Sequence, residues 1–300
     1  MTALRRMSQN RLARPLSFAD AQARIERERR LGATLVKLGR LNEEALERIT
    51  AIQKRTNTPF ASAASKLGLI TSEDVATALA AQNGFLRETD GEGRLPTGMV
   101  IVRRPKAKEA EQFRALRTRL LTSTDAEKIN LFAIAASGSS TEADHVTLNM
   151  AASFAQIGKR VLIVDADLRS ARLAARFGVA AGPGLRETLT GECDVRRAIR
   201  PTIVANLSIL TAGAKIAISG ELLSSETLAL TFDYLRCAFD IVIVMTTPFG
   251  RVADAQFVWA SVRQVFVVTR RHFDRLNDLK ALNAALRQTD ASVLGAALAG

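Results

Sequence analysis

Short apolar runs, separated by polar turns and helix-compatible segments, organise the chain from about residue 107 onward. The runs at residues 131–136, 161–164 and 239–244 are apolar almost throughout, which is typical of strands buried on both faces of a parallel sheet. Further strands are predicted at 207–212, 265–269 and 293–298, and helices at 107–121, 146–157 and 274–287. Strand, loop, helix and strand follow one another between residues 131 and 169. This order predicts an α/β fold with a parallel sheet flanked by helices.

A repeat with a period of 29 residues marks the first third of the chain as a separate, small all-α domain. Gly39 in the first copy recurs as Gly68, and each glycine predicts a left-handed cap that ends one helix. Three residues later, Asn42 and Thr71 predict the N-cap of the next helix. The repeat therefore predicts two packed helical hairpins at about residues 30–85.

Composition separates the remaining segments. Residues 86–106 carry glycine, proline and mixed charge without periodicity, which predicts a linker to a second domain at 107–300. Residues 1–29 form a basic arm: eight arginines lie in the first 30 positions, and the net charge of the chain is +12. The arm is interpreted as solvated, as attracted to an anionic membrane surface, or as bound to an acidic partner tail. Nucleic acid is not expected as a partner, because no aromatic stacking set accompanies the charge.

Cysteine, histidine and hydropathy exclude other classes. Cys193 and Cys237 are too few for a disulfide framework, and His145 and His272 lack the spacing of metal ligands, so no metal site is expected. No apolar run approaches the roughly 20 residues that span a bilayer, and the amino terminus lacks a signal-peptide pattern. We expect a soluble cytoplasmic protein, peripheral at the inner face of the plasma membrane.

The loop after the first strand is the candidate ligand site, because α/β folds bind ligands at the carboxyl ends of their strands. It comprises Ser137, Gly138, Ser139, Ser140 and Thr141. A phosphate-binding loop there has the pattern G-x-x-x-x-G-K-[ST], in which lysine neutralises the phosphates and the hydroxyl holds Mg²⁺. The next strand ends in two carboxylates, Asp165 and Asp167.

Several motifs stand in the order found in bacterial polysaccharide tyrosine autokinases, and the chain resembles that family. They are LIVDADLR at 162–169, Phe-Gly at 177–178, Pro-Gly-Leu at 183–185 and Glu-Leu-Leu-Ser-Ser at 221–225. The resemblance implies a P-loop NTPase-like fold of the SIMIBI type. With the N-terminal repeat included, the architecture is similar to that of an exopolysaccharide chain-length-determinant tyrosine kinase.

The positions that hold ATP and Mg²⁺ in that family carry other residues here. The lysine position is Ala143, with Glu142 before it and Asp144 after it. Met245 stands in place of the Walker B aspartate. Removing a cation while adding carboxylates opposes phosphate binding. The loop is therefore predicted to be vestigial.

These replacements predict that no catalytic residue operates and that no cofactor is bound. Asp165 and Asp167 would then survive as capping and packing residues. ATP with Mg²⁺ is expected only under the alternative that the chain is a divergent, active autokinase.

The predicted helix at 107–121 contains Glu111, Arg114 and Arg117, and their three-residue spacing places them along one helix face. An exposed salt-bridged face is one interpretation. The resemblance implies another, since the E-x-x-R-x-x-R motif forms the subunit contact of a ring in the autokinase family. A homo-oligomer is expected on that interpretation.

The N-terminal repeat resembles the small domain that precedes type II secretion and type IV pilus ATPases. In some members of that group, tandem motifs bind cyclic di-GMP. The residues that match in the first copy are Arg30, Leu31, Gly32, Leu35, Gly39 and Gln53. The second copy departs from the motif, with Pro59 and Phe60 at its leading positions. A protein-docking domain and a cyclic di-GMP receptor both remain open.

Together, these features predict a catalytically degenerate, tyrosine-autokinase-like adaptor or regulator of exopolysaccharide biosynthesis and export, of capsule or holdfast type. The partners that the resemblance implies are a membrane chain-length (co-polymerase) protein and an active tyrosine kinase paralogue. The alternatives are the active autokinase and the cyclic di-GMP receptor.

Overall fold

A computed structural model describes residues 31–56, 58–82, 93–122, 129–138, 140–250 and 252–299. The chain divides into two compact units, residues 1–82 and 83–300, which are described separately. The predicted basic arm and Arg30 lie outside the described residues. In the described part of the chain, no helix combines the length and apolarity needed to cross a membrane.

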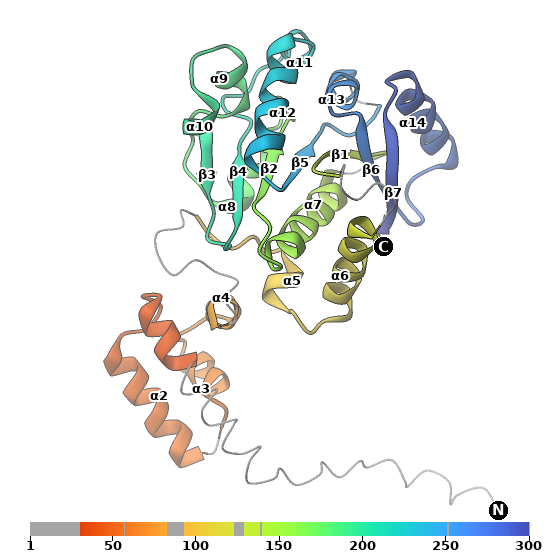
Figure 1. The fold of residues 1–300 in the computed structure, drawn as a ribbon. Helices are drawn as coiled ribbons and strands as arrows, with labels where there is room; N and C mark the ends of the chain where they lie inside the picture. The colour runs from red at the N-terminus through yellow and green to blue at the C-terminus, as the bar shows by residue number, and fades with distance from the viewer. Residues whose placement is uncertain are drawn as a thin grey trace, which may run out of the picture. The chain divides into compact units, whose positions relative to one another are not determined.

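The first unit is all-helical, as predicted from the repeat. Residues 31–37 are helical and are followed by α2 (Glu43–Thr56), α3 (Phe60–Lys66) and α4 (Ser72–Gln82) (Figure 1). Their apolar faces meet in a core that includes Leu35, Ile49 and Phe60.

Both predicted glycine caps are present. Gly39 has φ 65° and Gly68 has φ 67°, a region in which a residue with a Cβ is disfavoured. The residue after each glycine donates its N–H back to the helix: Arg40 to the Leu35 carbonyl at 2.9 Å, and Leu69 to the Ala64 carbonyl at 3.1 Å. These are Schellman bonds, and they end both helices in the same way.

Both predicted N-caps are present as well. Asn42 Oδ1 accepts the N–H of Ala45 at 2.8 Å. Thr71 and Asp74 form a reciprocal capping box, in which Thr71 Oγ1 accepts the Asp74 N–H and Asp74 Oδ2 accepts the Thr71 N–H. The repeat in the sequence is thus a repeat of helix ends.

The second unit contains a seven-stranded sheet with the order β3-β4-β2-β5-β1-β6-β7. All neighbouring strands are parallel except β3 and β4. This confirms the predicted parallel sheet. The strands are β1 (Leu131–Ala136), β2 (Val161–Asp165), β3 (Ile199–Pro201), β4 (Leu207–Leu210), β5 (Ile241–Met245), β6 (Gln264–Arg270) and β7 (Ser292–Ala299).

Helices cover both faces of this sheet (Figure 1). On one face lies α7 (Ser140–Ala155), with α5 (Val100–Arg103) and α6 (Lys108–Leu121) beside it. The other face packs against α12 (Glu226–Ala238), α13 (Asp254–Val262) and α14 (Leu276–Gln288). Four short helices complete the connections: α8 (Arg172–Phe177), α9 (Leu185–Leu189), α10 (Val195–Ala198) and α11 (Gly220–Leu223). Burial on both faces explains why β1, β2 and β5 are continuous apolar runs.

The segment predicted as a linker, residues 86–106, contributes to the core of the second unit over its described part. Leu95, Met99 and Ile101 are buried there, and α5 lies within the segment. The side chain of Asn149 in α7 accepts the Ile101 N–H at 3.0 Å and donates to the Gly98 carbonyl at 2.7 Å. A one-turn helix is too short to produce a visible period, which is why composition alone suggested a linker.

Candidate functional site

Parallel strand ends bring the candidate residues of the second unit together. β2 and β1 both neighbour β5, with Asp165 and Ile134 each in register with Met245. The loop after β1, the Asp165–Asp167 turn and Met245 therefore meet at one edge of the sheet, as the βαβ pattern predicted.

The predicted loop is shorter than expected, because α7 begins at Ser140. Thr141, Glu142, Ala143 and Asp144 are therefore helical, and only Ser137 and Gly138 of the predicted loop are described outside the helix. Ser139 lies outside the described residues. Small polar residues and an acidic first turn are common at a helix start, so the segment supports helix as well as loop.

Asp144, which the sequence predicts at the position of the Mg²⁺-binding hydroxyl, is the centre of a buried ion-pair cluster. Its side chain is 1% exposed and contacts two guanidinium groups from α8. Arg172 lies 3.2 Å from Asp144 Oδ1, and Arg176 lies 2.9 Å from Oδ2. Arg172 also pairs with Asp167. The carboxylate is thus neutralised by cations from the chain itself.

The two surviving carboxylates hold the turn between β2 and α8. Asp165 accepts the N–H of Leu173 at 2.9 Å and that of Asp167 at 3.1 Å, and Asp167 accepts the N–H of Ser170 at 3.1 Å. Burial raises the pKa of Asp165 to about 6, although these N–H groups and Arg172 favour the charged form. Burial also lowers the pKa of Arg172, but the attraction of Asp144 and Asp167 outweighs it, and the net shift of the Arg172 pKa is upward.

Asp274, from the β6–α14 connection, closes over the start of the loop. It accepts hydrogen bonds from Ser137 Oγ at 2.6 Å, Thr269 Oγ1 at 3.1 Å and the Arg270 N–H at 2.7 Å. Burial alone would raise the pKa of Asp274, but these bonds and the charge of Arg270 hold it below its usual value. A Cβ at Gly138 would lie 2.7 Å from Asp274 Oδ1, so the close approach needs glycine. An acidic residue therefore lies against the loop backbone.

The end of β5 carries no carboxylate. Met245 is buried, and Thr246 Oγ1 donates to the Ile134 carbonyl at 2.8 Å. Among the described residues, no group of three or more histidine, cysteine, aspartate or glutamate side chains could hold a metal ion.

The predicted interface residues on α6 make contacts within their own chain. Arg114 pairs with Glu111 at 2.8 Å and donates to the Pro105 carbonyl at 2.7 Å. Arg117 Nη1 donates to the Ser153 carbonyl in α7, also at 2.7 Å. Glu111 remains 72% exposed, so it is the member of the motif most available to another molecule.

The predicted cyclic di-GMP residues that the structure describes have roles in the fold of the first unit. Leu31 and Leu35 are buried in its core, and Gly39 is the helix cap described above. A Cβ at Gly32 would lie 2.5 Å from Leu46 Cδ1, so this glycine permits close packing. Gln53 is half-buried. Arg30, the charged member of the set, lies outside the described residues.

Sequence reasoning missed the basic residues around α8. Arg172 and Arg176 are four residues apart on one helix face, which was the available signal, but their partner Asp144 is distant in sequence. It also missed Asp254, which accepts from Arg169 at 2.8 Å and from Ser219 Oγ. Such pairs depend on tertiary geometry.

Comparison with known proteins gives the family. The AAA domain family (AAA_31) matches residues 138–289. Tyrosine-protein kinase YwqD of Bacillus subtilis is 31% identical over 221 residues, which cover 72% of this chain and 90% of YwqD. The succinoglycan biosynthesis transport protein ExoP of Rhizobium meliloti is 30% identical over 211 residues, which cover 65% of this chain but 27% of ExoP.

The fold agrees with these matches. The kinase domain of the Escherichia coli tyrosine kinase ETK superposes with a TM-score of 0.65 at 26% identity, covering 71% of this chain and 82% of that domain. The sheet order and flanking helices are thus those of a P-loop NTPase-like domain. The chain belongs to the family of bacterial tyrosine kinases that is built on this AAA-type domain.

Proposed function

We propose that this chain is a catalytically inactive member of the tyrosine kinase family that regulates exopolysaccharide biosynthesis and export as an adaptor. The observation that carries the proposal is the buried Asp144, bound by Arg172 and Arg176 where the family aligns a Mg²⁺-binding hydroxyl. A phosphate with its metal would have to displace this cluster.

The residues present do not fit ATP and Mg²⁺ held in the manner of the family. Ala143 supplies no cation, and the carboxylate of Asp144 next to it is already bound by Arg172 and Arg176. The neighbouring Asp274 adds a further carboxylate against the loop backbone.

The metal side of the site is also incompatible. Met245 ends β5 at the aligned Walker B position, and a thioether does not order a metal-bound water as a carboxylate does. Asp165 and Asp167 are engaged by backbone N–H groups and Arg172. No step of phosphoryl transfer is therefore assigned to this chain.

The names of the relatives support the link to polysaccharide biosynthesis and transport, to which the proposal adds the adaptor role. ExoP is a succinoglycan biosynthesis transport protein, and YwqD and ETK are tyrosine kinases. The proposed partners are a membrane chain-length (co-polymerase) protein and an active kinase paralogue. Self-association through Glu111, Arg114 and Arg117 belongs to the same proposal.

Titration of the full chain with Mg-ATP tests the absence of nucleotide binding. We expect no heat of binding and no phosphotyrosine after incubation, whereas YwqD, measured in parallel as a positive control, should show both. Micromolar affinity for Mg-ATP, or phosphate on Tyr234, the one tyrosine of the chain, would contradict the proposal.

Complementation tests the regulatory role. Deletion of the chain should alter the amount or length of exported polysaccharide, and Tyr234→Phe should restore it as fully as the wild type. Failure of Tyr234→Phe alone, with normal protein levels, would indicate that tyrosine phosphorylation of this chain matters.

A further inference from the structure

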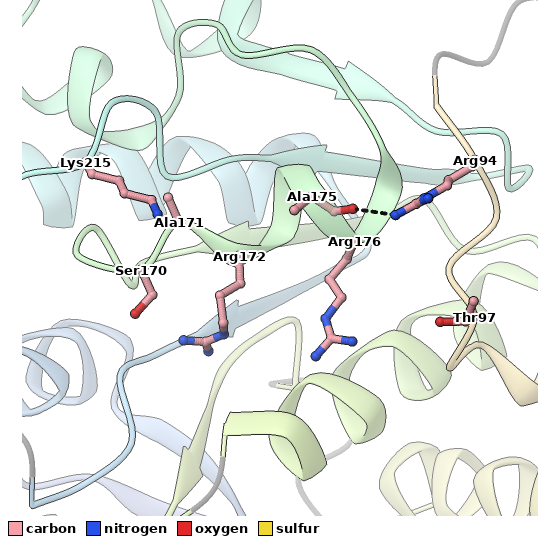
Figure 2. Close-up of a pocket in the computed structure, with 8 residues that line it drawn as sticks. All are labelled: Arg94, Thr97, Ser170, Ala171, Arg172, Ala175, Arg176 and Lys215. Atoms are coloured by element: carbon pink, nitrogen blue, oxygen red, sulfur yellow. Dashed lines mark hydrogen bonds between the residues drawn. The ribbon is translucent and has the colours of Figure 1, made fainter.

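A cavity of about 350 Å³ lies beside α8 and is lined mainly by basic and hydroxyl side chains. Its lining residues are Arg94, Thr97, Ser170, Ala171, Arg172, Ala175, Arg176 and Lys215. Figure 2 shows Arg172 and Arg176 leaving α8 in the same direction, with Lys215 and Arg94 toward opposite ends of the group. The proposed function uses Arg172 and Arg176 only through their contacts with Asp144, and it gives the cavity no role.

The charge of this cavity is not balanced. Arg172 and Arg176 share Asp144 and Asp167 as partners. Arg94 and Lys215 are different: among the described residues, neither lies within ion-pair distance of a carboxylate. Two cations therefore remain available to a ligand at the rim of the cavity.

Backbone hydrogen bonds fix the two segments that carry the rim cations. The Arg94 N–H donates to the Phe177 carbonyl at 2.6 Å, and its Nη2 donates to the Ala175 carbonyl at 3.4 Å. At the other end, the N–H of Ile216, next to Lys215, donates to the Leu168 carbonyl at 3.1 Å. The backbone positions from which Arg94 and Lys215 line the cavity are therefore set without a ligand.

The remaining lining residues suit an oxyanion. Ser170 and Thr97 supply hydroxyl donors, and the small side chains of Ala171 and Ala175 leave space between the cations. Ala171 has φ 50°, an uncommon conformation for a residue with a Cβ, and the strain is held at the wall of the cavity. A tetrahedral phosphoryl group has several oxygens for cations that approach from different sides, whereas a planar carboxylate suits one guanidinium fork.

We propose that this cavity is a binding site for a small phosphorylated ligand, held by Arg94 and Lys215 with Arg172 and Arg176 as its charged floor. The volume is at the lower end of ligand pockets, so it fits one or two phosphoryl groups better than a whole dinucleotide. Because the chain supplies the cations, binding needs no divalent metal. The site lies outside the loop after β1, and its test without Mg²⁺ keeps its failure distinct from that of the proposed inactivity.

Titration of the full chain with pyrophosphate in EDTA and low salt tests the site. We expect saturable binding that weakens as salt is added, because the rim cations are exposed and their attraction is screened. Lys215→Ala and Arg94→Ala should each weaken binding about tenfold, the amount expected for one charge-assisted hydrogen bond. Lys280→Ala, which removes an exposed lysine of α14, is the matched control and should bind as the wild type does.

Three results would overturn the proposal. They are no binding at millimolar pyrophosphate, equal affinity in the wild type and both rim variants, and equal affinity for pyrophosphate and chloride. Lys215→Arg should retain binding, which separates loss of charge from a disturbed loop.

Competition by ATP in EDTA identifies the source of the phosphoryl group: displacement indicates a nucleotide, and no displacement indicates a smaller phosphorylated compound. Mg²⁺-dependent ATP binding would instead contradict the proposed inactivity, whereas the titration in EDTA tests this site by itself.

Discussion

Two groups of cations around α8 differ in whether a carboxylate binds them. Toward the loop after β1, Arg172 and Arg176 are bound to the buried Asp144. At the rim of the cavity, Arg94 and Lys215 have no carboxylate partner among the described residues. In the first region the carboxylate of Asp144 is buried and neutralised by the chain itself. The second is open and carries excess positive charge. Burial and pairing, rather than the number of cations, distinguish the two.

The difference matters because the two regions respond to the same charges in different ways. A buried guanidinium depends on its partner, since an unpaired charge in a low-dielectric environment is costly. An exposed lysine retains its hydration and contributes little to stability until an anion arrives. Substitutions on the loop side should therefore change stability, and substitutions on the cavity side should change binding.

The largest effect is expected for Asp144→Ala, which removes the carboxylate between Arg172 and Arg176. Removing one partner of a buried ion pair typically costs about 3–5 kcal/mol, and we expect the lower end because Arg172 keeps Asp167. Urea unfolding of the full chain measures the loss in the second unit. Asp233→Ala is the control, because its pair with Arg236 is exposed and should change the free energy of unfolding by less than about 0.5 kcal/mol. Similar values for the two variants would contradict the comparison.

A pH effect of intermediate size is expected from Asp165. Its pKa is raised to about 6 in the folded chain by burial, against an unfolded value of about 3.9, so the folded state holds the proton more tightly. A raised carboxyl pKa means that stability increases as the pH falls from about 6 toward 4. Between pH 7 and pH 4.5 the contribution amounts to about 2 kcal/mol.

Comparison with Asp165→Asn separates the contribution of Asp165 to the pH dependence of stability from those of the other carboxylates. Asp274 and Asp254, for example, have lowered pKa values despite burial, because of their hydrogen bonds and neighbouring arginines, and they lose stability in acid. The free energy of unfolding of the wild type, relative to that of Asp165→Asn, should therefore increase as the pH falls. Parallel stability curves for the two proteins would show that Asp165 titrates normally.

A smaller change in stability is expected for Arg176→Ala, which acts on both regions. Arg176 is partly exposed and Asp144 keeps Arg172, so the loss in stability should be about 1 kcal/mol. The same variant should weaken pyrophosphate binding, because it removes a cation from the cavity floor. Arg119→Ala, at an exposed position of α6, should change neither quantity. A loss of stability with unchanged pyrophosphate binding would show that Arg176 acts only through Asp144 and not in the cavity.

Much of the second unit could be predicted because its strands are buried on both faces. The bounds of β1 agree with the apolar run at 131–136, and Asp165 and Met245 meet because parallel strands end at one edge. The start of α7 at Ser140 was not predictable, since small polar residues suit both a loop and a first turn. Helices of one or two turns, such as α5 and α8, are too short to show a period.

The charge cluster could be predicted only in part. The sequence led to the prediction that Ala143 replaces a lysine and Asp144 a hydroxyl, but it did not indicate the cations that neutralise Asp144. They come from α8, 28 and 32 residues away, and reach Asp144 only when α8 docks against α7. Arg94 and Lys215 are farther apart still in the sequence, and both line the cavity beside α8 only in the folded chain.

The smallest effect on stability is expected at Glu111, which gives a baseline for a charge pair outside both regions. Glu111 is 72% exposed and pairs with Arg114 at 2.8 Å, so Glu111→Arg should change the free energy of unfolding by about 0.5 kcal/mol or less. The reversal leaves the bonds of Arg114 to Pro105 and of Arg117 to Ser153 in place, because those use carbonyl acceptors.

If the E-x-x-R-x-x-R face joins copies of the chain, as the proposed self-association requires, light scattering should show a lower mass for Glu111→Arg than for the wild type. Glu226→Arg, in the first turn of α12, controls for the change in net charge. Equal masses for all three proteins would restrict the motif to contacts within its own chain, because a charge reversal at the most exposed member would then have disturbed no neighbour.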